Sequence, residues 1–156
     1  MATERACRRC RDRLDQSAES TSDLDTLRRE TIAELRTAIG FGRWCSLLID
    51  PDTLIANRGI GETDFSHELP RLNLRDGRFG DIINSVVLAC SREHAGVLSA
   101  ATGGVLARSW RWREVFASYG VGDELRAVAV DDRGCWGDII LLRDSDDPPS
   151  TPTTRG

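Results

Sequence analysis

Two apolar segments near the end of the chain flank a four-residue turn sequence, and this feature limits the fold most strongly. Two segments have the length and composition of strands: Leu125 to Val130 and Cys135 to Arg143. The turn sequence between them is Asp131-Asp132-Arg133-Gly134. Glycine in such a turn adopts the positive φ that a tight connection needs. The pattern predicts a β-hairpin, so we expect the chain to contain an antiparallel sheet.

The segments before this hairpin have helical and strand patterns. Apolar residues recur at helical spacing behind a capping Ser22 or Asp23, which predicts a helix over 22–39. Further predicted elements are, in chain order, a strand over 44–50, a turn at 50–53, a returning strand over 54–58, a short helix within 62–72 that ends near Pro70, a helix or a competing strand over 79–88, and a helix over 105–119. Helices combined with paired strands predict an α+β fold, in which helices pack on one antiparallel sheet.

The two ends of the chain differ from its middle in composition. Residues 1–22 are polar and rich in Arg, and residues 144–156 are rich in Asp, Pro, Ser and Thr. Such segments have too few apolar side chains to form a core. We expect a mobile arm over 1–22, one folded domain over 23–143 and a disordered tail over 144–156.

Charge and hydropathy argue against several classes of protein. The 156 residues include 21 basic residues, all of them Arg, and 25 acidic ones, which gives a net charge of −4. The absence of Lys is typical of a GC-rich coding sequence. The slightly acidic net charge argues against a domain that binds nucleic acid. The apolar runs are too short to cross a membrane, and no signal-peptide pattern begins the chain. We expect a cytoplasmic protein that binds neither nucleic acid nor membrane directly.

Motifs for catalysis and metal binding are missing from the sequence. The five cysteines are odd in number and irregularly spaced, unlike a disulfide framework. Cys7 and Cys10 have the spacing of half a zinc site, but no second pair completes four ligands. His67 and His94 are isolated, and no phosphate-binding or nucleophile motif occurs. We therefore predict a protein that is not an enzyme and has no catalytic residue, metal or cofactor.

Large aromatic side chains are the candidates for the walls of a ligand pocket. Pockets combine aromatic and apolar walls with few polar groups, although large aromatic residues also form cores. The candidate lining residues are Trp44, Trp112, Tyr119 and Trp136.

One acidic residue interrupts the last predicted strand. Strand alternation places Trp136, Ile140 and Leu142 on one face and Cys135 on the other. Asp138 lies within the first, apolar face. It is either a charge at a sheet edge or a polar anchor in a cavity.

Several short segments, taken together, resemble one family of regulators. They are Gly40-Phe41-x-Arg43-Trp44-Cys45, Asp50-Pro51-Asp52-Thr53, Ala101-Thr102-Gly103-Gly104-x-Leu106-Ala107-Arg108-Ser109, Trp112-Arg113-Glu114-Val115, Gly120-Val121-Gly122-Asp123-Glu124-Leu125 and Gly134-Cys135-Trp136-Gly137. In this order, over about residues 24–147, the chain resembles actinobacterial LuxR-type helix-turn-helix transcriptional regulators with an N-terminal GAF-like sensor domain. The resemblance implies a GAF-like fold, a central antiparallel sheet with helices packed on it.

The resemblance also implies a regulatory role. In that family a further helix closes the GAF-like domain and a DNA-binding domain follows, and we expect this chain to lack both. It would then be a non-enzymatic sensor domain that binds a small molecule or a partner chain. We expect it to self-associate through the bare sheet face or the N-terminal helix. Two alternatives stay open: a truncated fragment without independent activity, and a GAF-fold reductase that uses Cys45, Cys90 and Cys135.

Overall fold

The computed structural model describes residues 4–147, and the chain divides into two compact units. Among the described residues, one unit contains residues 4–41 together with Asp147, and the other is Gly42–Asp146. The second unit contains the sheet and both cavities described below. Most of the tail expected over 144–156 lies outside the described residues.

The first unit is a helical hairpin. Helices α1 (Glu4–Ser20) and α2 (Leu24–Ile39) are joined by residues 21–23, and the Asp23 carboxylate caps α2 by accepting from the Thr26 N–H at 2.8 Å. The predicted helix over 22–39 is confirmed. Where we expected a mobile arm over 1–22, the structure has α1. Helix α1 lies beside α2, and an ion pair between Arg13 and Glu34 at 3.1 Å joins the two helices.

The second unit is built on a five-stranded antiparallel sheet. The strands are β1 (Arg43–Ile49), β2 (Ala56–Glu62), β3 (Ala95–Val97), β4 (Val121–Asp131) and β5 (Gly134–Asp144), in the order β2-β1-β5-β4-β3. The predicted hairpin is β4 and β5, and the predicted α+β fold is confirmed. Strand β3 was not predicted because it has only three residues.

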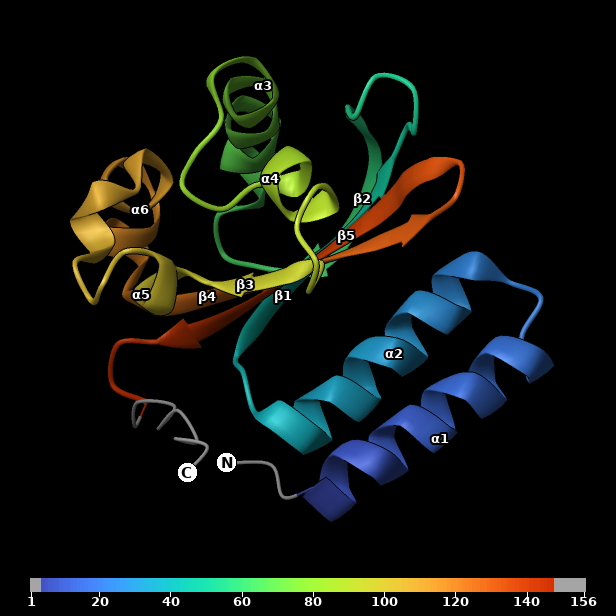
Figure 1. Ribbon diagram of the computed structural model, residues 1–156. Coiled ribbons are helices and arrows are strands. Elements are labelled where there is room, and N and C mark those ends of the chain that lie inside the picture. Colours follow the sequence, from blue (N-terminus) through green and yellow to red (C-terminus); the bar gives the residue numbers. More distant parts are fainter. Residues whose placement is uncertain (1–3, 148–156) are drawn as a thin grey trace. The chain divides into compact units, whose positions relative to one another are not determined.

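Helices of this unit cover one face of the sheet (Figure 1). They are η1 (Ser66–Glu68), α3 (Leu69–Phe79), α4 (Ser85–Ala89), α5 (Leu98–Ala101), η2 (Leu106–Arg108), α6 (Trp110–Glu114) and η3 (Phe116–Tyr119). The core between sheet and helices includes Cys45, Leu47, Phe65, Leu72, Trp110, Val115, Phe116, Val121, Ile140 and Leu142.

Three helix boundaries differ from the sequence expectation. Pro70 lies in the first turn of α3 rather than near a helix end, since proline lacks the N–H that this turn leaves unpaired. The segment over 79–88 is helical only in α4, because Gly80 ends α3 at a φ of 69° and Asn84 caps the next helix. The helix expected over 105–119 is three short helices, interrupted at Ser109 and Val115.

A bulge in β5 changes which side chains share a face. The register shifts between Ala129 and Val130, so that Cys135 pairs with Val130. Cys135 therefore packs with Ile49, Leu88 and Val128 under the helices rather than on the far face, which corrects the alternation expected from the sequence.

The sheet face that we expected to be bare is covered within the same unit. Ile140 and Leu142 are buried among core residues, whereas Trp136 is exposed in the hairpin. The argument for self-association through that face therefore loses its basis. Self-association itself stays a prediction.

Candidate ligand-binding site

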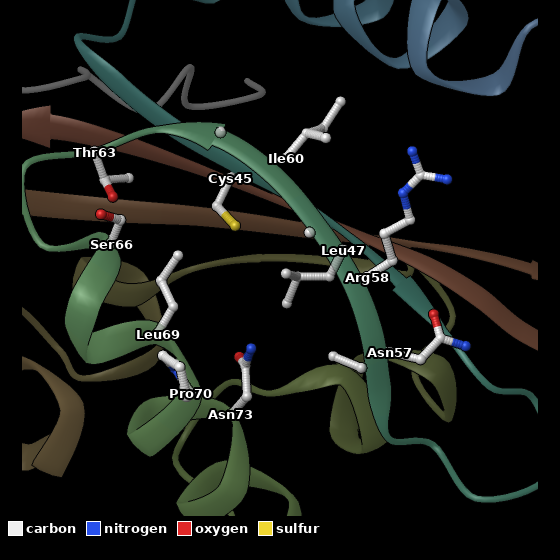
Figure 2. A pocket seen from close by; sticks show the side chains of 13 residues that line it. Cys45, Leu47, Asn57, Arg58, Ile60, Thr63, Ser66, Leu69, Pro70 and Asn73 are labelled. Atoms are coloured by element: carbon white, nitrogen blue, oxygen red, sulfur yellow. The ribbon is translucent and has the colours of Figure 1, made fainter.

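A cavity of about 360 Å³ lies between the sheet edge formed by β1 and β2 and the helices η1 and α3 (Figure 2). Its walls come from β1, β2, the connection that follows β2, and the helices η1 and α3. The lining residues are Cys45, Leu47, Ala56, Asn57, Arg58, Gly59, Ile60, Gly61, Thr63, Ser66, Leu69, Pro70 and Asn73.

Two glycines of β2 keep the cavity open at the sheet edge. Gly59 pairs with Leu47 and Gly61 pairs with Cys45, so both glycines share the helix-covered face with these residues. A Cβ on Gly61 would lie 2.6 Å from the Trp44 carbonyl oxygen, and a Cβ on Gly59 would lie 3.0 Å from Leu47 Cδ2. Glycine at these two positions of β2 therefore permits the close approach of β2 to β1 beside the cavity.

Polar groups converge on one end of this cavity. Figure 2 shows the Thr63 and Ser66 hydroxyls facing each other, with the Cys45 sulfur directed into the space beside them. The Thr63 Oγ1 atom is buried and has no hydrogen-bond partner within residues 4–147. A buried hydroxyl without a partner costs free energy, and a bound hydrogen-bonding group would remove that cost.

The other walls are mostly neutral. Leu47, Leu69 and Pro70 supply apolar surface, and Asn73 directs its amide toward the cavity. Arg58 is the charged residue of the lining, and it pairs with Leu48, which places its side chain on the opposite face of the sheet. The cavity therefore suits a small molecule with an apolar body and at least one hydrogen-bonding group.

A second, narrow cavity of about 20 Å³ adjoins the first. The two share Leu47, Ala56 and Asn73 as lining residues, and the narrow cavity is also lined by Ile49, Leu54, Asp76, Asn84, Ser85, Val86 and Arg126. A volume of this size holds one water-sized group.

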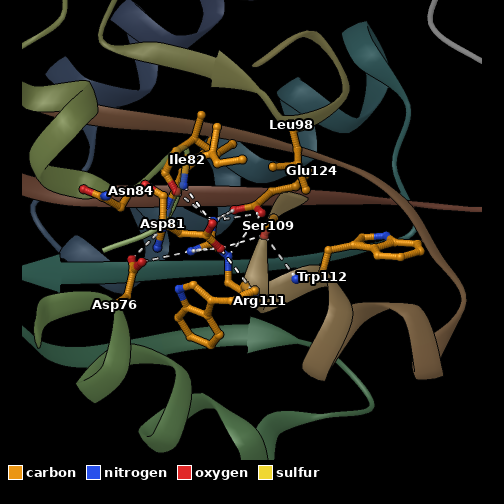
Figure 3. A network of polar contacts seen from close by, with 12 residues as sticks. Asp76, Asp81, Ile82, Asn84, Leu98, Ser109, Arg111, Trp112 and Glu124 are labelled. Carbon is orange, nitrogen blue, oxygen red and sulfur yellow. Dashed lines mark hydrogen bonds and ion pairs between the residues drawn. The ribbon is translucent and has the colours of Figure 1, made fainter. Parts of the chain in front are cut away.

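Behind the narrow cavity lies a network of buried charged side chains, which Figure 3 shows in part. Arg111 from α6 is 3 % exposed, and its Nη1 donates to Asp76 at 3.0 Å and its Nη2 to Glu124 of β4 at 3.1 Å. Asp81 accepts from the Ser109 hydroxyl at 2.6 Å and from the Arg111 backbone N–H at 3.2 Å. These contacts hold α6 against the end of α3 and the sheet.

Arg126 of β4 continues the network toward β5. Its Nε donates to Asp138 at 2.8 Å, and its Nη1 donates to Asp76 at 2.9 Å. Asp76 thus bridges the two arginines. The Ser85 hydroxyl donates to the same Asp138 oxygen at 2.7 Å, while the other oxygen of Asp138 is buried with no partner in the described part of the chain.

The network holds more acidic than basic groups. Two arginines, Arg111 and Arg126, form ion pairs with four carboxylates, which belong to Asp76, Asp81, Glu124 and Asp138. Burial raises the pKa of Glu124, against the attraction of both arginines. Burial by itself would lower the pKa of Arg126. The negative charges of Asp138 and Asp76 outweigh this effect and raise the pKa above its ordinary value, so the guanidinium stays charged.

The four aromatic residues predicted to line a pocket lie apart from these cavities. Trp44 is buried on the sheet face opposite Cys45, and Trp136 is exposed and donates its indole N–H to Asp131 at 2.8 Å. Trp112 of α6 and Tyr119 of η3 are partly buried and pack against the core. None of the four lines either cavity.

Asp138 is not the sheet-edge charge that the sequence left open. Its strand, β5, lies in the middle of the sheet, and the residue is 1 % exposed. It lines neither of the two cavities, and it is paired with the buried Arg126 instead.

The lining residues of the cavity were missed at the sequence level, although two signals exist. Gly59 and Gly61 alternate directly after the strand predicted over 54–58, and alternating glycines next to a strand indicate close backbone approach. Glu124 and Arg126 are two residues apart in the strand before the one that contains Asp138. Their side chains therefore lie on the same face of that strand, the face toward the core.

The cysteines and histidines occupy separate places. Cys45 and Cys135 are buried, Cys90 is exposed, and none of the five cysteines forms a disulfide within the described part of the chain. His67 Nε2 lies 3.2 Å from the Tyr119 hydroxyl, and His94 Nδ1 lies 3.2 Å from the Leu88 carbonyl oxygen. Among residues 4–147, no group of three or more His, Cys, Asp or Glu side chains could hold a metal ion. No helix in this range is long and apolar enough to span a membrane.

Comparisons with known proteins add no relationship. The sequence matches no protein-family model and no curated protein.

Proposed function

We propose that this chain is a regulatory sensor domain that binds a small molecule in the larger cavity. The regulatory role rests on the sequence resemblance to LuxR-type regulators with GAF-like sensor domains. The antiparallel sheet with helices on one face is compatible with that resemblance. The proposed domain acts in the cytoplasm, without catalysis and without contacting DNA itself.

The observation that carries the proposal is the cavity of about 360 Å³ with, at one end, the Thr63 hydroxyl, which has no hydrogen-bond partner among the described residues. Its volume falls in the range of small-molecule sites, roughly 300–1,000 Å³. Apolar walls with few convergent polar groups are typical of such sites. The proposed ligand is small, with an apolar body and a group that hydrogen-bonds to Thr63 or Ser66.

The reductase alternative has less support. A reactive cysteine needs a lowered pKa, because the thiolate is the nucleophile. Burial instead raises the pKa of the Cys135 thiol, which lowers its thiolate fraction.

A thermal-shift screen of the full chain with small metabolites tests the proposal. Ligand that binds only the folded state stabilises it by RT ln(1 + [L]/Kd), about 2.7 kcal/mol at a hundredfold excess over Kd. The cavity is blocked by Ala56→Leu, since Ala56 lines both cavities. Ala101→Leu is the matched control, because Ala101 is exposed in α5.

We expect at least one compound to raise the melting temperature of the unsubstituted chain and of the Ala101→Leu variant, but not of the Ala56→Leu variant. The proposal fails if no compound raises the melting temperature, or if the shift persists with Ala56→Leu.

A further inference from the structure

Strand β2 (Ala56–Glu62) forms one edge of the sheet. The strand order is β2-β1-β5-β4-β3, so among the described residues β1 is the one strand that pairs with β2. In a strand with one neighbour, the backbone groups of alternate residues point away from that neighbour and can pair with a further strand. The strand at the other edge, β3, has three residues, whereas β2 has seven. The β2 edge is therefore the longer template for strand pairing.

This edge is accessible and regular. Its exposed residues are Asn57, Arg58, Gly59, Gly61 and Glu62. Sheet edges are commonly protected by proline, by a bulge or by a covering segment. Residues 58–62 contain no proline, and they pair with β1 without a register shift. The residues of this edge can therefore continue the sheet.

The symmetry of a dimer limits how two β2 strands can pair. Side chains alternate between the faces of a strand, so Arg58, Ile60 and Glu62 share one face, and Gly59 and Gly61 share the other. Two antiparallel copies of one strand are related by a twofold axis perpendicular to the sheet. Such an axis passes through one residue position and places each residue opposite one of the same face.

Charge selects the residue on the axis. With Arg58 on the axis two arginines meet, and with Glu62 on the axis two carboxylates meet; like charges directly opposite each other are destabilising. With Ile60 on the axis, each Arg58 lies opposite Glu62 of the second copy, which gives two pairs of opposite charge. In this register Gly59 lies opposite Gly61, so no side chains collide on the other face. An axis through either glycine forms no pair between Arg58 and Glu62.

We propose that β2 is a self-association edge, where a second copy of this chain adds its own β2 antiparallel with Ile60 on the twofold axis. The sheets of the two copies then form one continuous sheet, with the helices of both on the same face. This surface differs from the sheet face and the N-terminal helix expected from the sequence. Pairing of one short strand buries little surface, so the dimer is weak and reversible. It does not depend on a ligand in the cavity.

Analytical ultracentrifugation of the full chain over about a hundredfold range of protein concentration tests the inference through the dissociation constant of the dimer. Arg58→Glu and Glu62→Arg each place like charges opposite each other twice. We expect each variant to raise the dissociation constant at least about tenfold. Arg133→Glu is the matched control, because Arg133 is exposed in the β4–β5 turn and the change in net charge equals that of Arg58→Glu. The control is expected to dimerise like the unsubstituted chain.

Restoring the charge pairs shows which residues meet. The double variant Arg58→Glu/Glu62→Arg exchanges the two charges, and we expect it to dimerise like the unsubstituted chain. An equimolar mixture of the two single variants is expected to form a heterodimer, because every pair in it is again of opposite charge. Hydrogen exchange of the unsubstituted chain locates the interface independently. We expect the amides of residues 57–62 to exchange more slowly as the protein concentration rises.

The inference is overturned if the chain stays monomeric at every concentration, or if Arg58→Glu dimerises as tightly as the unsubstituted chain. It is also overturned if folded single variants lose dimerisation and neither the double variant nor the mixture recovers it. Circular dichroism and the melting temperature show whether each variant is folded. If a variant does not fold, hydrogen exchange decides, because a dimer that leaves residues 57–62 unprotected contradicts the proposed edge.

Discussion

Arg126 is buried at the centre of the charged network, and replacing it by Met removes the partner of two carboxylates. Its guanidinium donates to Asp138 at 2.8 Å and to Asp76 at 2.9 Å, and the residue is 3 % exposed. In the Arg126→Met variant the Ser85 hydroxyl is the one hydrogen-bond partner that Asp138 keeps among the described residues, while Asp76 keeps Arg111.

The expected cost follows from these two contacts. A hydrogen bond to a charged group contributes roughly 1.5–3 kcal/mol, and removing one partner of a buried ion pair costs about 3–5 kcal/mol. We therefore expect Arg126→Met to lower the free energy of unfolding by about 3–5 kcal/mol. Because domains are stable by about 5–15 kcal/mol, such a loss is measurable and leaves a folded protein in most of that range.

Urea denaturation at pH 7 measures this loss, with Arg133→Met as the control. Arg133 is exposed in the β4–β5 turn, so its replacement is expected to change stability by less than about 0.5 kcal/mol. The double variant Arg126→Met/Asp138→Leu removes the uncompensated charge as well. It is expected to recover at least about 1 kcal/mol relative to Arg126→Met.

The reasoning is refuted if Arg126→Met costs less than about 1 kcal/mol at an unchanged denaturant slope. It is also refuted if the double variant is less stable than Arg126→Met, since the cost would then not come from a stranded carboxylate.

Three further predictions concern the network and the glycine strand. Because the pKa of Glu124 is raised in the folded state, the unsubstituted chain is expected to lose stability relative to Glu124→Gln as the pH rises above about 4.5, as followed by urea denaturation. Ser109→Ala removes both the N-cap of α6 and a donor to Asp81, and we expect it to lower the free energy of unfolding by about 1–2 kcal/mol in the same assay. Gly61→Ala is expected to lower the melting temperature more than Gly59→Ala, because its Cβ meets backbone rather than a mobile side chain.

Each of these predictions has a clear contrary result. A stability difference between Glu124→Gln and the unsubstituted chain that is constant from pH 4 to 8 would show that Glu124 does not titrate abnormally. An unchanged denaturation midpoint for Ser109→Ala would mean that its two hydrogen bonds add nothing. Equal melting temperatures for the two glycine variants would contradict the close approach of β2 to β1.

Local patterns in the sequence predicted the elements that depend on neighbouring residues. The β4–β5 hairpin follows from its turn and its two apolar flanks, and α2 follows from its apolar spacing and its Asp23 cap. Short helices such as α4 and α6 could not be delimited, because their ends depend on single caps at Asn84 and Ser109.

Features that depend on distant residues were not predicted. The cavity forms where β2 meets α3, and the charged network joins Asp76 of α3, Arg111 of α6 and Asp138 of β5. No local pattern states which strands become neighbours. The β5 bulge shows the same limit, because one extra residue moved Cys135 to the other face.

The most direct test of ligand binding is an NMR titration of the ¹⁵N-labelled full chain with the compound of the metabolite screen that raises its melting temperature most. The account predicts saturable shifts of the backbone amides of Gly59, Gly61, Thr63 and Asn73, which line the larger cavity. Absence of saturable shifts at these residues, or saturable shifts confined to α1 and α2, would contradict it.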